Sequence, residues 1–113
     1  MKLALIPCLI ATTASADPAH VTAVTMSGDS ISVTIQHPDT GWDHYADGWE
    51  VLDADGNRIG FRELAHPHVN EQPFTRSTSG VAIPNGATSV FIRTRCSVDG
   101  WDEELFEAVL GND

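Results

Sequence analysis

The feature that most constrains the fold is a strict alternation of apolar and polar residues at positions 31–35. Ile31, Val33 and Ile35 are apolar, and the two residues between them are Ser32 and Thr34. Successive side chains of a β-strand point to opposite faces, so this pattern is typical of a strand with one buried face and one solvated face. Half-buried strands of this kind are common in antiparallel sheets.

Short apolar runs recur along the chain, with turn residues between them. They predict further strands at residues 21–26, 49–51, 59–61, 74–79, 81–83 and 90–96. Gly28-Asp29, Asp55-Gly56 and Pro84-Asn85-Gly86 supply turn signals between these runs. Short strands at such spacing favour an antiparallel immunoglobulin-like or fibronectin-like β-sandwich of about seven strands.

The last segment, residues 102–110, carries both strand and helix signals. An Asp cap at Asp102, acids in the first turn and a closing glycine at Gly111 are typical of a helix. A strand is nevertheless favoured, because the sandwich needs a closing partner at its edge. No linker or repeat divides the chain, so residues 17–113 are predicted to form one all-β domain.

Two residues are expected in the core of this sandwich. Trp49 is predicted to be the tryptophan that packs between the sheets. Cys96 shares strand parity with Val90 and Ile92, whereas the residues between them include Arg93. Cys96 is therefore predicted to be buried and unpaired, because it is the one cysteine left after removal of a leader.

The first 16 residues resemble a secretory signal peptide. Lys2 precedes a short apolar run, and Ala14-Ser15-Ala16 follows as an A-x-A cleavage site. The run is shorter than the roughly 20 residues that a membrane span needs. We therefore expect a periplasmic or secreted protein without a membrane span. Six Lys and Arg residues against 16 Asp and Glu residues give a net charge of −10 and argue against nucleic acid as a partner.

Two segments carry a resemblance to known proteins. Residues 41–49 (GWDHYADGW) and 66–77 (HPHVNEQPFTRS) are similar to segments of small exported bacterial proteins of unknown function. The resemblance implies a small all-β sandwich and no particular activity. This chain departs from the group at Asp102-Glu103-Glu104, where the group has a Gly-rich hairpin that contains Lys.

The HPHVNEQ segment predicts a candidate metal site. On an extended segment His66 and His68 project to the same side, about 7 Å apart, with His44 and Glu71 as further candidate ligands. Two or three imidazoles with a carboxylate suit copper or zinc. The alternative is that both histidines only hydrogen-bond within a loop. His37, which precedes a proline, is interpreted as a solvated turn residue.

Aromatic residues in polar loops form a second candidate site. Trp42, Tyr45 and Trp101 are expected to expose rings that can bind a sugar or a protein partner. His44 and Arg76 complete this predicted surface, and Arg76 is expected to pair with Asp43, Asp47 or Glu71. No nucleophile elbow, phosphate loop or zinc-protease motif is present.

The sequence therefore favours a non-enzymatic exported binding module with a protein or an envelope component as its partner. Its functional surface is predicted to combine the loop from Trp42 to Asp47, which carries His44, with residues 66–76. Periplasmic copper or zinc binding through His66 and His68 is the second hypothesis. An enzyme of unrecognised type is the third.

Overall fold

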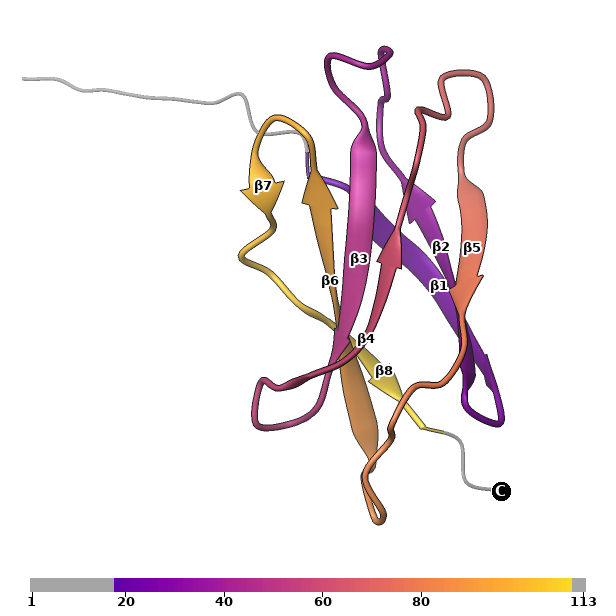
Figure 1. The fold of residues 1–113 in the computed structure, drawn as a ribbon, viewed down its shortest axis with the longest axis vertical. Helices are drawn as coiled ribbons and strands as arrows, with labels where there is room; N and C mark the ends of the chain where they lie inside the picture. The colour runs from indigo at the N-terminus through magenta and orange to yellow at the C-terminus, as the bar shows by residue number, and fades with distance from the viewer. Residues whose placement is uncertain (1–17, 111–113) are drawn as a thin grey trace, which may run out of the picture.

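The computed structural model describes residues 18–110, which form two antiparallel sheets (Figure 1). The strands are β1 (His20–Ser27), β2 (Ser30–Gln36), β3 (Ala46–Leu52), β4 (Arg58–Glu63), β5 (Phe74–Thr78), β6 (Ser89–Cys96), β7 (Gly100–Trp101) and β8 (Phe106–Val109). One sheet has the order β1-β2-β5, and the other has the order β4-β3-β6-β7, with β8 also paired to β6. The predicted all-β sandwich is confirmed, with eight strands within residues 18–110 rather than about seven.

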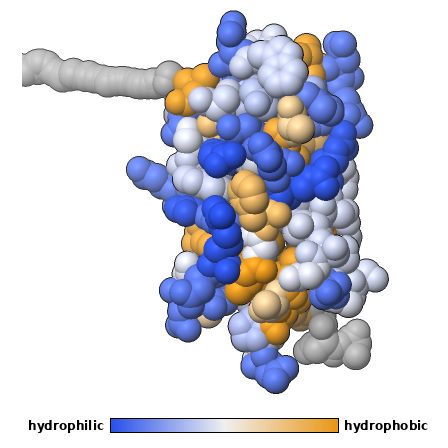
Figure 2. Space-filling model, in the orientation of Figure 1, coloured by the Kyte–Doolittle hydropathy of each residue, from blue (hydrophilic) through white to orange (hydrophobic). Residues whose placement is uncertain are grey.

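The core lies between the two sheets. Ile31, Val33 and Ile35 are fully buried on β2, and Trp49 and Val51 are fully buried on β3. The alternation that predicted β2 thus reports its buried face, and the prediction that Trp49 is a core residue is confirmed. Figure 2 shows the complementary exterior: hydrophilic residues cover much of the visible face, and apolar residues gather mainly toward its lower end.

Strand β6 has the predicted parity. Its even-numbered residues from Val90 to Cys96 are buried and its odd-numbered residues are half-buried. Thr94 is accommodated in this buried row because its hydroxyl donates a hydrogen bond to the carbonyl of Ala19. Cys96 is buried and is the free cysteine of the described residues, so its predicted state is confirmed.

The predictions for three other segments have mixed outcomes. The last segment forms strand β8 on β6, so the favoured strand interpretation of that segment is confirmed. Residues 81–83 are not a strand: the amide of Val81 donates to Asp29 and that of Ala82 donates to Ile59, which ties this segment to a turn and to β4. Trp101 lies in β7 rather than in a loop, because the chain reverses at Gly100, with φ of +77°, and pairs with β6.

One end of the sandwich gathers segments that are distant in the sequence. Strands β2 and β6 both end there, and β3 begins there (Figure 1). The β2–β3 connection, residues 37–45, crosses this end from one sheet to the other. Among residues 18–110 no helix has the length and apolar character that a membrane crossing requires.

Candidate metal centre

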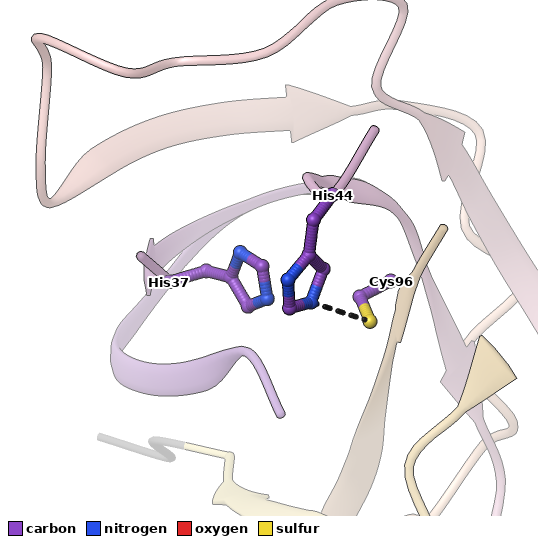
Figure 3. Close-up of side chains that lie close together, drawn as sticks. All are labelled: His37, His44 and Cys96. Atoms are coloured by element: carbon purple, nitrogen blue, oxygen red, sulfur yellow. Dashed lines mark hydrogen bonds between the residues drawn. The ribbon is translucent and has the colours of Figure 1, made fainter. Parts of the chain in front are cut away.

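Three side chains with strong metal-binding atoms converge at this end of the sandwich. They are His37 directly after β2, His44 in the β2–β3 connection and Cys96 at the end of β6, and they point toward one another (Figure 3). One ligand atom from each lies within 4.8 Å of the other two. Among residues 18–110, it is the one group of three or more His, Cys, Asp or Glu residues whose ligand atoms lie close enough together to hold a metal ion.

The pairing of β3 with β6 brings His44 to Cys96. Ala46 is the Cα partner of Cys96, and His44 lies two residues before it. The Ser97 amide donates to the Tyr45 carbonyl at 2.9 Å, and the Ser97 hydroxyl accepts from the Tyr45 amide at 3.0 Å. These bonds hold the connection against the end of β6. As a result, His44 Nε2 lies 3.5 Å from Cys96 Sγ.

His37 occupies the next inward-facing position after Ile35. Its side chain is fully buried, so the interpretation of His37 as a solvated turn residue is wrong. The period-two alternation of β2 continues through residue 37, although β2 ends at Gln36. The backbone is satisfied at this point because the His37 amide donates to Gln72 Oε1 at 2.9 Å.

Asp39 fixes the His37 ring. Its buried carboxylate accepts a hydrogen bond from His37 Nδ1 at 2.5 Å and another from the Ala46 amide at 3.0 Å. Its second oxygen accepts from the His68 amide at 2.8 Å. A carboxylate that accepts from one imidazole nitrogen sets the tautomer and leaves the other nitrogen as the metal-binding atom.

That other nitrogen, His37 Nε2, is buried without a hydrogen-bond partner among the described residues. The ring of His37 lies edge-on to that of His44, with 4.8 Å between centroids. A buried polar atom without a partner costs free energy unless something satisfies it. A metal ion held with His44 and Cys96 would use the lone pair of this nitrogen.

The Cys96 sulfur also forms hydrogen bonds with Asp99. The Asp99 amide donates to Sγ at 3.3 Å, and the thiol donates to Asp99 Oδ2 at 3.6 Å. Burial raises the pKa of the thiol above its ordinary value, because the charged thiolate is poorly solvated there. Without a metal ion the thiol is therefore protonated at neutral pH, and a metal must displace its proton.

We expect Cys96 to react slowly with a thiol reagent in the folded protein and rapidly in denaturant. Both the 3% exposure of Cys96 and its raised pKa reduce the accessible thiolate. The measurement is the labelling rate at pH 7.5 with and without urea. Equal rates in the two conditions would contradict the burial of Cys96.

A cavity borders Cys96. Its volume is about 590 Å³, and its other lining residues include His20, Asp99, Trp101 and Glu104. The acidic side chains in this wall attract cations. The cavity thus places negative charge close to Cys96, and neither His37 nor His44 lines it.

The predicted ligands His66 and His68 lie beside this cluster. Their ring centroids are 4.9 Å apart, and Arg76 Nη2 donates to His68 Nε2 at 2.9 Å. His68 also stacks on Phe74 at 3.9 Å between centroids. Its Nε2 lone pair is therefore engaged by Arg76, so the neutral ring carries its proton on Nδ1, which is buried without a hydrogen-bond partner among the described residues.

The other residues predicted for function are distributed over two places. Trp42 and Tyr45 form an edge-to-face pair at 5.6 Å, and Trp42 is 68% exposed. Glu71 pairs with Arg76 at 3.4 Å, and it is one of the three alternative partners predicted for Arg76. Trp101 instead packs on Phe61 and on arginine side chains of the larger sheet, among them Arg95 at 5.1 Å.

The stability of the fold should decrease as the pH is lowered, and part of this decrease should depend on His68. Burial, the charge of Arg76 and the neighbouring His66 lower the pKa of His68, whereas Glu71 and Asp39 oppose this. The unfolded chain therefore binds the His68 proton more readily, and stability is greatest above pH 6.5 and decreases as the pH falls through that value.

Urea unfolding of the wild type and of His68→Gln at pH 7.5 and pH 5.5 measures this effect. The loss of unfolding free energy over this interval should be larger in the wild type. Titrating carboxylates contribute similarly to both proteins, so the difference isolates His68. An equal loss in the two proteins would argue against a lowered pKa.

Comparisons with known proteins give one partial relative. No family model matches the chain, and no solved structure matches it. The chain is similar to a protein of Halomicrobium mukohataei named "Putative lipoprotein", with 44% identity over 70 residues. The match covers 62% of this chain and 34% of that protein, so it spans about a third of the length of the curated relative.

Proposed function

We propose that this protein is a non-enzymatic, exported metal-binding module that holds one copper or zinc ion through His37, His44 and Cys96. The observation that carries the proposal is His37 Nε2, a buried nitrogen without a partner among residues 18–110, on a ring oriented by Asp39. It belongs to a group whose three ligand atoms lie within 4.8 Å of one another. Two imidazoles and a thiolate suit ions of the copper and zinc type and are poor ligands for calcium or magnesium.

Two arguments support export: a sequence pattern and the name of a similar protein. The leader predicted at residues 1–16 lies outside the described residues, so its support comes from the sequence pattern alone. The similar protein from Halomicrobium mukohataei carries the name "Putative lipoprotein", and lipoproteins are exported. A periplasmic or secreted location would expose the protein to metal ions in the cell envelope.

Calorimetric titration of the purified protein with Zn²⁺ and with anaerobic Cu⁺ tests the site. We expect one-to-one binding that is lost in His37→Ala and in His44→Gln and retained in His20→Ala, which removes an exposed histidine. Binding that survives His37→Ala and His44→Gln but disappears in His66→Ala and His68→Ala would place the metal at the HPHV segment instead. Weak binding insensitive to all these changes would reflect only the charge of −10.

A second candidate function is recognition of a partner beside the metal centre. A shallow groove of about 550 Å³ is lined by the exposed rings and side chains of Trp42, His66, Val69 and Glu71. Trp42 is 68% exposed and Val69 is 50% exposed, so this surface offers apolar contact area to a partner. Titration with soluble envelope glycans should quench the fluorescence of the wild type and not that of Trp42→Ala. An unchanged signal in the wild type would contradict glycan recognition.

A further inference from the structure

The geometry of the cluster bears on which metal it takes, an inference that rests on the proposed metal site. His44 Nε2 and Cys96 Sγ are 3.5 Å apart. With bonds of about 2.0 Å to nitrogen and about 2.3 Å to sulfur, this separation corresponds to an angle of about 110° at the ion. The pair is therefore already spaced for a common ion, at an angle near those of tetrahedral and trigonal sites.

The number of ligands separates copper from zinc. Structural zinc sites use four protein ligands, and catalytic zinc sites use three with a water in the fourth position. The group here has three members among the described residues, and two of them, His37 and Cys96, are at most 3% exposed. Copper is stable with two histidines and one cysteine in a trigonal arrangement that needs only a weak or distant fourth ligand.

The surroundings of the sulfur act on both oxidation states of copper. The Asp99 amide donates to Sγ at 3.3 Å and withdraws electron density from the thiolate. Hydrogen bonds to a ligating cysteine and burial of the site both tune the redox potential of copper. Cu(I) with one thiolate is neutral, which suits a buried site, whereas the extra positive charge of Cu(II) is stabilised by the Asp99 carboxylate, whose Oδ2 lies 3.6 Å from Sγ, and by the Asp39 carboxylate on His37.

The fold holds the segments that carry the ligands close together. Cys96 lies on β6, His37 is fixed by Asp39, and the hydrogen bonds at Tyr45 and Ser97 hold the connection that carries His44. The three ligand atoms lie within 4.8 Å of one another, whereas bonds of about 2.0 Å to nitrogen and about 2.3 Å to sulfur bridge at most about 4.3 Å, so the widest pair must close in slightly on an ion. His44 is only half-buried, which leaves one ligand near the solvent.

We infer that this cluster is a copper centre that cycles between Cu(II) and Cu(I) with His37, His44 and Cys96 as ligands in both states. Cu(II) accepts one electron from a one-electron donor and becomes Cu(I), and a one-electron acceptor removes that electron again. No ligand bond breaks and no proton moves in either direction. The centre would therefore store or pass on single electrons.

Titration with Cu(II) followed by visible absorption tests this inference. The wild type should develop an intense thiolate-to-copper charge-transfer band that saturates at one equivalent, bleaches with ascorbate and returns with ferricyanide over repeated cycles. Cys96→Ser should lack the band. His44→Gln, which changes a half-buried residue, should lose or shift it, and His66→Ala, which changes an exposed histidine outside the cluster, should retain it.

The possible failures can be told apart. If the protein binds Zn²⁺ one-to-one but Cu(II) gives no such band, the copper inference is wrong and the metal site stands. If the first cycle oxidises Cys96 or releases the copper, the cycling between oxidation states is refuted. If calorimetry finds no tight binding of any of these ions, the proposed function itself fails.

Discussion

Replacing Trp49 with alanine should lower the free energy of unfolding by about 3 to 5 kcal/mol, enough to unfold much of the protein at 37 °C. Trp49 is fully buried on β3, in the centre of the core that both sheets share. Its removal leaves a cavity that the strands on both sides cannot close. The cost of this cavity therefore adds to the free energy lost with the buried apolar surface. Urea or thermal unfolding followed by circular dichroism measures the loss.

Trp42→Ala is the matched control for this change. Trp42 is 68% exposed, and its ring contacts Tyr45 at the surface. We therefore expect a loss below about 1 kcal/mol, as for a surface substitution. A larger loss of unfolding free energy for Trp42→Ala than for Trp49→Ala would contradict the placement of Trp49 in the core. It would also contradict the placement of Trp42 in the exposed groove.

Replacing Asp39 with alanine should lower the free energy of unfolding by about 3 to 5 kcal/mol and also impair metal binding. Three donors would lose their acceptor: His37 Nδ1, the Ala46 amide and the His68 amide. Each unsatisfied buried donor costs about 1 to 3 kcal/mol. The change also releases the His37 ring from its orientation, so stability and affinity should fall together.

Asp39→Asn separates these two effects. It preserves the volume but replaces a carboxylate that accepts from three donors, and affinity for Zn²⁺ or Cu⁺ should fall about 10- to 100-fold, as for other groups that orient a metal ligand. Asp47→Asn, which affects only the half-exposed pair with Arg95, is the control and should change stability by less than about 1 kcal/mol. Unchanged affinity in Asp39→Asn would contradict the role of Asp39 in positioning His37.

The local pattern of the sequence was sufficient for much of the fold. The alternation at Ile31, Val33 and Ile35 marks the buried face of β2, and the parity of Cys96 with Val90 and Ile92 marks that of β6. Both rest on the two-residue period of a strand, which does not depend on the partner. The 81–83 segment shows the limit of this reasoning, since its residues are apolar but bond to a turn and to β4.

The candidate site could be predicted only in part. The sequence names His44 as a further candidate ligand beside His66 and His68, whereas it places His37 in a solvated turn and Cys96 in the core. The signal that could have found them was present: His37 continues the buried parity of β2, and Cys96 ends that of β6. A buried histidine and a buried cysteine at the last inward positions of two strands are a reason to ask whether those strands end side by side.

The sequence by itself determined which residues face inward, because burial on a strand follows from a local period. Only the tertiary structure decided which inward residues meet. His37 and Cys96 are 59 positions apart in the sequence, and they converge because β2 and β6 end at the same end of a sandwich and the β2–β3 connection carries His44 across it. Convergence of this kind depends on sheet order and strand direction, and no single segment contains that information.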